Sequence, residues 1–297
     1  TEDKEPGFTL TSSANTEGTI QPNKAAEASF TNTYSAKATF SPVAEKLLLN
    51  RELLRYQFVF DLYQIGEDGT ETQLRSASNG RPDTVAKRED GTVESSHATA
   101  TFGALRYTQE DAGNTYTYKI VERDTGKDGY TYSTASYTVA VAVTDNGDGT
   151  LSLDVVYRDS NGQVVEGAVF GNAYKAAGEI TLRAWKDLQG RSLTDDEFTF
   201  ELLDENGDVI DTKPNSADGS IVFDALRYDE TDIGKTYHYA VRELAGEDPT
   251  VIYDSSEYGY SVEVLDNGDG TLSLNQGFAT PIYSETGIQC ETCRGTG

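Results

Sequence analysis

The sequence predicts an all-β protein made of tandem β-sandwich modules, and three observations lead to this fold class. The chain is rich in aromatic residues and glycine, with 18 Tyr, 11 Phe and 28 Gly among its 297 residues, as expected of short, half-buried strands joined by tight turns. Its apolar residues alternate with polar ones over short runs, and its segments recur at fixed separations. Because one sandwich takes about 100 to 150 residues, the length predicts two modules and a remnant.

The first repeat has a separation of 121 residues. ATFGALRYTQEDAGNTYTYKIVERDTG at 100–126 resembles IVFDALRYDETDIGKTYHYAVRELAG at 221–246. The sequence DNGDGTLSL occurs at 145–153 and again at 266–274, and both copies follow an alternating run. Asn-Gly and Asp-Gly steps in this setting predict a strand, a tight hairpin turn and a second strand.

The second repeat lies near the start of each module and has a separation of 140 residues. EKLLLNRELLRYQFVFDL at 45–62 matches WKDLQGRSLTDDEFTFEL at 185–202, and each copy carries a lysine twelve residues before a phenylalanine. The two separations differ by 19 residues, so the first module carries 19 extra residues. We place them in the polar stretch 64–98, which predicts a long surface loop or an added hairpin.

These repeats divide the chain into three parts. Residues 1–34 are predicted to be the C-terminal remnant of a preceding β-sandwich module, because they end in ASFTNTY, which resembles AVFGNAY at 168–174. Residues 35–175 form the first complete module with the inserted loop 64–98, and residues 176–297 form the second, with an incomplete or aberrant C-terminal end. A remnant cannot close a core by itself, so its N-terminal part should be poorly packed.

The charge balance and the cysteines exclude several classes of function. Acidic residues outnumber basic ones by 50 to 24 along the whole chain, which argues against a surface for nucleic acid or an anionic membrane. No run is apolar over the ~18 residues of a membrane helix, and the first residues do not resemble a signal peptide, so an exported parent would contribute an internal or processed segment. Cys290 and Cys293 lie in the last eight residues and cannot supply a disulfide framework.

The sequence predicts no metal site, no cofactor and no hydrolase triad. Cys290 and Cys293 have no second Cys or His cluster beside them, which favours an unstructured or aberrant tail. The two DNGDG turns have Gly147 and Gly268 where a calcium loop needs Asp or Asn, and ordinary hairpin turns explain them. The two histidines lie in different modules without a nucleophile motif nearby.

A lysine, a glutamate and an asparagine mark the chemistry of the first module. Period-two geometry places Glu122 on the same strand face as the tyrosines of its Y-x-Y-x-I-x-E run, and Glu243 occupies the same place in the second copy. Burial disfavours charge, so a lysine in an apolar core becomes a neutral nucleophile and a glutamate there stays protonated. Such a glutamate could donate a proton toward an amide oxygen and pass another to leaving ammonia. The alternative is an ordinary surface ion pair, with the asparagine capping a turn.

The order of these motifs resembles the stalk modules of Gram-positive pilins and adhesins, of the CnaB-type and streptococcal pilin isopeptide-linkage family. The motifs are a lysine early in the module, Y-x-Y-x-I-x-E in the middle and F-x-N-x-Y at the end. The resemblance implies immunoglobulin-like β-sandwiches and an intramolecular isopeptide bond between Lys46 and Asn172, assisted by Glu122. It implies a single-turnover reaction and not an enzyme. Asn32, in the first F-x-N-x-Y, would be the acceptor remnant of the preceding module.

The second module departs from this pattern. Lys186 and Glu243 are present, but the residue 121 positions after Asn172 is Cys293. The nearest local match, GFATPIY, has Thr280 where asparagine is expected, and Asn275 is a weaker candidate, so the partner of Lys186 is unknown. A frameshift would explain both the missing acceptor and the late cysteines, so we predict that the residues after about 274 are not native sequence.

The sequence therefore favours a structural stalk segment of a cell-surface pilin or adhesin. The resemblance places it on the extracellular, cell-wall-anchored surface of a Gram-positive bacterium. It gives as partners the neighbouring modules of the same polypeptide and other pilin subunits joined through a sortase. The alternatives are an adhesive module that binds a host or carbohydrate ligand through 64–98, and an accessory β-sandwich domain of a secreted cell-wall enzyme. The stretch 64–98 lacks an aromatic platform or apolar cluster, so the stalk is preferred.

Overall fold

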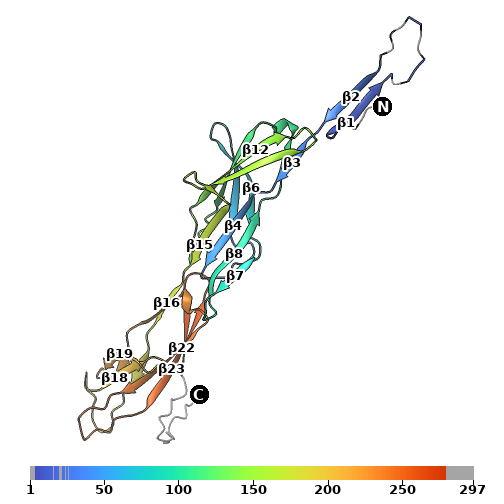
Figure 1. The fold of residues 1–297 in the computed structure, drawn as a ribbon. Coiled ribbons are helices and arrows are strands. Elements are labelled where there is room, and N and C mark those ends of the chain that lie inside the picture. Colours follow the sequence, from blue (N-terminus) through green and yellow to red (C-terminus); the bar gives the residue numbers. More distant parts are fainter. Residues whose placement is uncertain (1–3, 16, 20–21, 24, 26, 279–297) are drawn as a thin grey trace. The chain divides into compact units, whose positions relative to one another are not determined.

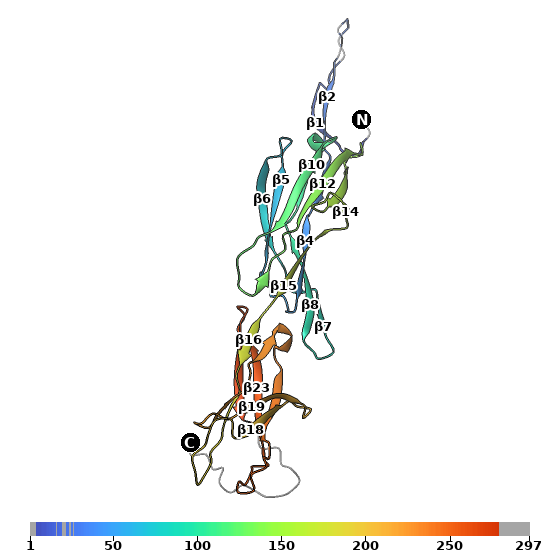
Figure 2. The same ribbon diagram turned by 90° about the vertical axis from the view of Figure 1, so that its left-hand side faces the viewer.

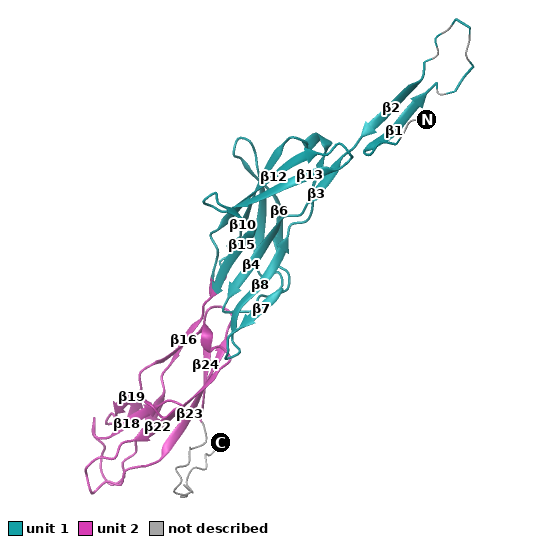
Figure 3. Ribbon diagram, in the orientation of Figure 1, with its two compact units in different colours: residues 1–126, 131–173 teal, residues 127–130, 174–297 magenta. Residues whose placement is uncertain are grey.

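The computed structural model describes residues 4–278 except 16, 20, 21, 24 and 26. These residues form 24 strands and two short 3-10 helices, so the prediction of an all-β fold is confirmed. The chain divides into two compact units (Figure 3), unit 1 with residues 1–126 and 131–173, and unit 2 with residues 127–130 and 174–297. No helix in the described part of the chain is long and apolar enough to span a membrane.

Unit 1 begins with a separate hairpin. Strands β1 (Phe8–Ala14) and β2 (Ser29–Tyr34) pair antiparallel in a two-stranded sheet of their own. Every residue of β1 is exposed, because two strands alone offer no second layer to cover either face.

The remainder of unit 1 is a sandwich of two larger sheets (Figures 1 and 2). One sheet has the order β14-β13-β12-β10-β5-β6, the other has the order β11-β15-β4-β8-β7, and β3 pairs with β9. The strands are β3 (Lys37–Phe40), β4 (Val43–Leu49), β5 (Val59–Ile65), β6 (Glu71–Ser78), β7 (Thr84–Lys87), β8 (Val93–Thr101), β9 (Leu105–Thr108), β10 (Thr115–Glu122), β11 (Tyr130–Thr131), β12 (Ser136–Asp145), β13 (Leu151–Arg158), β14 (Val164–Val165) and β15 (Ala168–Tyr174), with the 3-10 helix η1 (Gln109–Asp111) after β9.

The core of this sandwich follows from the period-two alternation of its strands. In β10 the buried residues are Tyr118, Ile120 and Glu122, and β4 and β15 alternate in the same way. Phe60 of β5 packs on Phe170 of β15 with ring centroids 5.1 Å apart. The first long strand, β4, and the last, β15, are parallel neighbours, which brings the two ends of the sandwich sequence together.

The polar stretch 64–98 is not one inserted loop. It contains β6, β7 and the first part of β8. Strand β8 pairs with β4 and buries Ser96, Ala98 and Ala100, so it belongs to the core. Strand β7 pairs only with β8 in its sheet order, and among the described strands of unit 2 none corresponds to it. The alternation of small residues in SSHATATF was the signal that marks β8 as a strand.

Unit 2 repeats much of this plan, and several of its strands are shorter than their counterparts in unit 1. Its main sheet has the order β19-β18-β22-β23-β24, and β16 pairs with β21 and β17 with β20. The elements are β16 (Ala177–Ile180), β17 (Arg183–Trp185), β18 (Thr199–Leu203), β19 (Val209–Pro214), β20 (Ser220–Val222), β21 (Leu226–Asp229), η2 (Glu230–Asp232), β22 (Thr236–Glu243), β23 (Glu257–Asp266) and β24 (Leu272–Phe278). Both DNGDGT segments connect antiparallel strands, as predicted for hairpin turns.

Candidate cross-linking sites

The fold brings Lys46, Glu122 and Asn172 together inside unit 1. Lys46 lies on β4 and Asn172 on the parallel neighbour β15, where Phe170 is the register partner of Lys46. Glu122 is the last residue of β10 in the opposite sheet. All three are buried, with Lys46 0% exposed, Asn172 2% and Glu122 9%. Each of these residues lies on the same face of its strand as buried apolar residues, so its polar side chain points into the core.

The three side chains meet at one carboxylate oxygen. Glu122 Oε1 lies 2.7 Å from Lys46 Nζ and accepts a hydrogen bond of 3.0 Å from Asn172 Nδ2. Lys46 and Glu122 thus form a close ion pair. The angles at Lys46 Nζ do not suit a hydrogen bond, and this atom makes none to any of the described residues. The ring centroid of Phe58 lies 4.4 Å from the same Nζ atom, which covers the amine with an apolar face.

A backbone amide holds the other end of the carboxamide. The Ser133 N–H donates to Asn172 Oδ1 at 2.7 Å and, less directly, to Glu122 Oε2 at 3.2 Å. An N–H group can only donate, so the Asn172 atom that faces it is the oxygen and the atom that faces Glu122 is the nitrogen. This differs from the expectation that Glu122 protonates the amide oxygen, because Ser133 occupies that side.

Burial shifts the acid–base balance of the pair toward its neutral form. Desolvation lowers the pKa of Lys46 to about 8, although the nearby Glu122 charge opposes the shift. Desolvation likewise raises the pKa of Glu122, against the effect of Lys46. A lysine with this pKa is neutral in roughly a tenth of molecules at pH 7, against fewer than one in a thousand for an ordinary lysine. The site therefore supplies an uncharged amine beside a carboxamide.

Asn79 is a supporting residue that the sequence analysis missed. It is 0% exposed; its Oδ1 accepts from the Phe58 N–H at 2.8 Å, and its Nδ2 donates to the carbonyls of Leu54 and Gly80 at 2.8 and 2.9 Å. These bonds fix the backbone that carries the Phe58 ring beneath Lys46. Asn215 makes the same bond to the Phe198 N–H at 2.7 Å, but it follows Phe198 by 17 residues whereas Asn79 follows Phe58 by 21, so neither repeat separation aligns the two asparagines.

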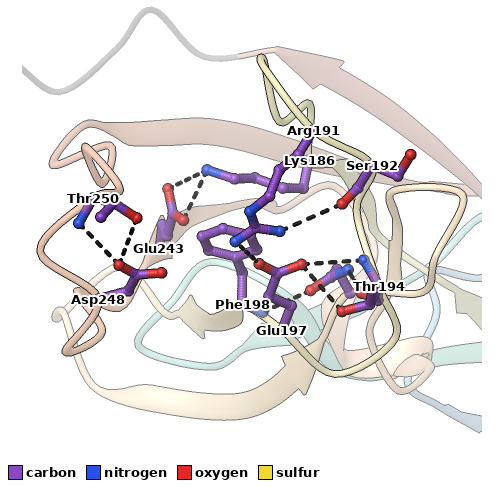
Figure 4. A network of polar contacts seen from close by, with 10 residues as sticks. Lys186, Arg191, Ser192, Thr194, Glu197, Phe198, Glu243, Asp248 and Thr250 are labelled. Carbon is purple, nitrogen blue, oxygen red and sulfur yellow. Dashed lines mark hydrogen bonds and ion pairs between the residues drawn. The ribbon is translucent and has the colours of Figure 1, made fainter.

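Unit 2 holds a second lysine–glutamate pair. Lys186 Nζ donates to both carboxylate oxygens of Glu243 at 2.8 Å, and it lies 4.4 Å from the ring centroid of Phe198 (Figure 4). The backbone N–H of Asp254 donates to Glu243 Oε2 at 3.0 Å. Asp254 is 121 residues after Ser133, so this amide repeats the donor of the first site. The side chains of Lys186 and Glu243 are 12% and 4% exposed, a slightly more open setting than the first pair.

The loop beside this second pair has its own polar network, also drawn in Figure 4. Arg191 forms an ion pair with Glu197, and the backbone and hydroxyl of Thr194 both donate to Glu197 Oε2 at 3.1 Å. The Asn215 Nδ2 donates to the Thr194 carbonyl at 2.8 Å. These contacts order the loop that leads into Phe198, the ring under Lys186.

Comparison with known families decides the identity of these modules. Residues 42–175 and 182–286 each match the family described as the Spy0128-like isopeptide containing domain. The chain belongs to this family. Membership confirms the resemblance that the motifs predicted, and it makes the chain a structural, pilin-type segment of the extracellular surface and not an enzyme.

Solved structures of pilins are similar to this chain at low sequence identity. The major pilin protein of one Streptococcus pyogenes serotype is 16% identical over 82% of this chain and 91% of that chain, with a TM-score of 0.32. Another major pilin structure from Streptococcus pyogenes is 17% identical over 82% and 92%, with a TM-score of 0.29. The SpaE basal pilin from Lactobacillus rhamnosus GG is 12% identical over 80% and 90%, with a TM-score of 0.21. No curated protein matches the sequence.

The remaining predicted residues of this Spy0128-like chain lie apart from a complete site. Asn32 is exposed on β2, opposite Leu10 of β1. Asn275 lies on β24, where its amide donates to Glu263 Oε2 at 3.3 Å on the exposed surface. Thr280 and Cys293 lie outside the described residues. The frameshift hypothesis concerns residues after about 274, most of which also lie outside the described residues. Within the described residues no group of three or more His, Cys, Asp and Glu could hold a metal ion.

Proposed function

We propose that the first module of this stalk segment, residues 35–175, joins Lys46 to Asn172 by a self-generated isopeptide bond. The observation that carries the proposal is the position of Glu122 Oε1, which lies 2.7 Å from the lysine nitrogen and accepts from the amide nitrogen at 3.0 Å. One buried oxygen thus touches both the attacking and the leaving nitrogen. It is placed to move a proton from one to the other.

The reaction follows from this arrangement. The neutral Lys46 amine attacks Cγ of Asn172, and the Ser133 N–H stabilises the negative charge that develops on Oδ1. Protonated Glu122 donates its proton to Nδ2 and takes one from the attacking Nζ, so its own protonation state is restored. The Cγ–Nδ2 bond then breaks, ammonia leaves, and an amide joins Nζ to Cγ. Folding holds the groups in place, and effective molarities of about 10⁵ M or more allow an otherwise inert amide to react once.

The bond would reinforce the module where its sequence ends meet. Strands β4 and β15 are parallel neighbours, so tension that enters through β4 and leaves through β15 shears their hydrogen bonds. A covalent link between the two strands carries that tension past the ladder. By analogy with a disulfide that closes a loop of this size, it would stabilise the module by about 4 to 5 kcal/mol through the unfolded state.

The wider assignment rests on family membership. We propose that residues 176–297 form a second module of the same kind, that residues 1–34 belong to a preceding one, and that Asn32 was the acceptor there. The segment would stand in a cell-wall-anchored stalk of a Gram-positive bacterium, with other pilin subunits joined through a sortase. Lys186 and Glu243 repeat the donor half of the first site, and their acceptor is unassigned.

The test is the intact mass of the denatured chain. Loss of one ammonia relative to the calculated mass is expected, and Lys46→Ala or Glu122→Ala should abolish it. Lys119→Ala is the matched control, because Lys119 forms an exposed ion pair with Glu71 at 2.8 Å and should leave the loss intact. A chain with no mass loss, or with no peptide joining positions 46 and 172 after digestion, would overturn the proposal. Loss of two ammonias would reveal an acceptor for Lys186.

A further inference from the structure

A tyrosine hydroxyl binds the DNGDGT turn of unit 1. Tyr34, the last residue of β2, donates to Asp145 Oδ1 at 2.6 Å and accepts from the Gly149 N–H at 3.3 Å. The hydrogen bond to Asp145 raises the pKa of Tyr34. The ring of Phe8 packs on the Tyr34 ring with centroids 5.0 Å apart. Strand β2 is therefore tied to a turn that lies 111 residues later in the sequence.

Unit 2 contains the same contacts at its own DNGDGT turn. Tyr174 donates to Asp266 Oδ1 at 2.5 Å and accepts from the Gly270 N–H at 3.3 Å. The ring of Tyr130 packs on Tyr174 with centroids 4.9 Å apart. Asp145 and Asp266 are the first residues of the two turns, and the two glycines are the fifth. Both tyrosines end an F-x-N-x-Y strand, so the same contact between a strand-ending tyrosine and a DNGDGT turn occurs in both units.

Close backbone contact accompanies each tyrosine. A Cβ atom on Gly7 would lie 2.7 Å from the Gly149 nitrogen and 2.6 Å from the Tyr34 ring. One on Gly129 would lie 2.7 Å from both the Gly270 nitrogen and the Tyr174 ring. No real Cβ atom fits at such distances. The chain leaving the tyrosine is held at the same point, because the Ser35 N–H donates to the Gly7 carbonyl at 3.0 Å. The Lys175 N–H donates to the Gly129 carbonyl at 2.8 Å.

The turn itself does not require the fifth glycine to approach another chain segment. Gly147 and Gly149 have φ of +78° and +84°, so both serve the left-handed backbone of the turn. A Cβ on Gly147 would meet nothing within 4 Å, whereas one on Gly149 would lie 2.7 Å from the Gly7 Cα atom. The turn accounts for the positive φ of both glycines. The short distance between Gly149 and Gly7 is explained only by the contact with the strand pair β1–β2.

We propose that each DNGDGT turn is a docking site for the tyrosine that ends the preceding F-x-N-x-Y strand, and we name this contact the tyrosine latch. The partner of each turn is a strand pair that precedes, in the same polypeptide, the sandwich to which the turn belongs. For the first turn this pair is β1–β2. The latch restrains the chain as it leaves that strand for β3 or β16. It is separate from the isopeptide bond and would persist in a chain that forms no bond.

Amide hydrogen exchange in the intact chain, followed by NMR, tests the latch at the Ser35 and Lys175 amides. Gly149→Ala should accelerate exchange at Ser35 by about tenfold or more, because a close-packed contact cannot absorb the added carbon. Gly147→Ala is the matched control: it has the same backbone strain in open space and should leave Ser35 near its original rate. The Lys175 amide of the same molecule should be unchanged in both variants.

A gentler pair of variants covers the case in which Gly149→Ala unfolds unit 1. Tyr34→Phe removes only the hydroxyl and should accelerate Ser35 exchange about three- to tenfold without affecting Lys175. Tyr174→Phe should do the reverse, so each latch serves as the control for the other. Equal Ser35 rates in Gly149→Ala and Gly147→Ala, or an unchanged Ser35 rate in Tyr34→Phe, would overturn the proposal.

Discussion

Replacing Asn79 with alanine should loosen the first site without touching a reacting group. The side chain is fully buried and makes three hydrogen bonds to backbone groups, at 2.8, 2.8 and 2.9 Å. Each is worth about 1 kcal/mol net, so the variant should lose about 3 kcal/mol of the free energy of unfolding of unit 1. Phe58 would lose the hydrogen bond from its backbone N–H to Asn79, so its ring should be held less firmly under Lys46 and cross-linking should slow.

The change in stability is measured in an Asn172→Ala background, where the bond cannot form. Hydrogen exchange of β10 and β22 peptides against denaturant reports the two units separately. The loss should appear in β10 and not in β22, and Asn215→Ala should show the opposite. Asn161→Ala, at an exposed turn position, is the surface control. An Asn79→Ala chain within 1 kcal/mol of that control, with an unchanged rate of ammonia loss on refolding, would refute the reasoning.

Three further predictions concern the first site. Ser133→Pro, which removes the N–H bonded to Asn172 at 2.7 Å, should reduce the cross-linked fraction on refolding at least tenfold, whereas Ser133→Ala keeps the N–H and should cross-link normally; equal yields would exclude Ser133 from the reaction. In an Asn172→Ala chain the lowered pKa of Lys46, about 8 against 10.5, means that the unfolded state binds more protons between these values. Stability should therefore rise from pH 8 to pH 10.5, by up to about 3 kcal/mol, relative to an Asn172→Ala/Lys46→Met chain, and parallel urea midpoints would contradict it. Lys46→Ala should make unit 1 digestible by a protease under conditions in which the unaltered chain resists, and equal digestion of the two would show that the bond adds no resistance.

Strand alternation predicted the sandwich and the inward face of Glu122, whereas the meeting of Lys46, Glu122 and Asn172 was implied by the resemblance to the isopeptide-linkage family. The alternation of apolar and polar residues shows which side chains of a strand point inward, and the repeats show which strands of the two modules correspond. The contribution of Ser133 could not be predicted in this way, because a backbone N–H has no residue signature. Strand β8 begins inside the stretch 64–98 that was predicted to be a long surface loop or an added hairpin, and its inward residues Ser96, Ala98 and Ala100 are small and offer little hydrophobic contrast.

Asn79 shows a different limit of sequence reasoning. Asparagine before a turn has an ordinary local explanation, and only the three-dimensional contact with the Phe58 backbone separates that explanation from support of the site. The proton path differed for a related reason. The expected donation from Glu122 to the amide oxygen depended on which way the carboxamide is turned, and a neighbouring donor in space decides that orientation.

The complete burial of Lys46 also bears on quality control during biogenesis. Because 0% of this residue is exposed and this burial lowers the pKa of its amine, the folded core is what makes the amine reactive toward Asn172. The proposed bond would thus be a chemical record that a molecule has reached its native state, written once and shielded afterwards from water and hydrolases. A population of stalk proteins could then be sorted by mass into those that folded correctly and those that did not, long after the folding event itself.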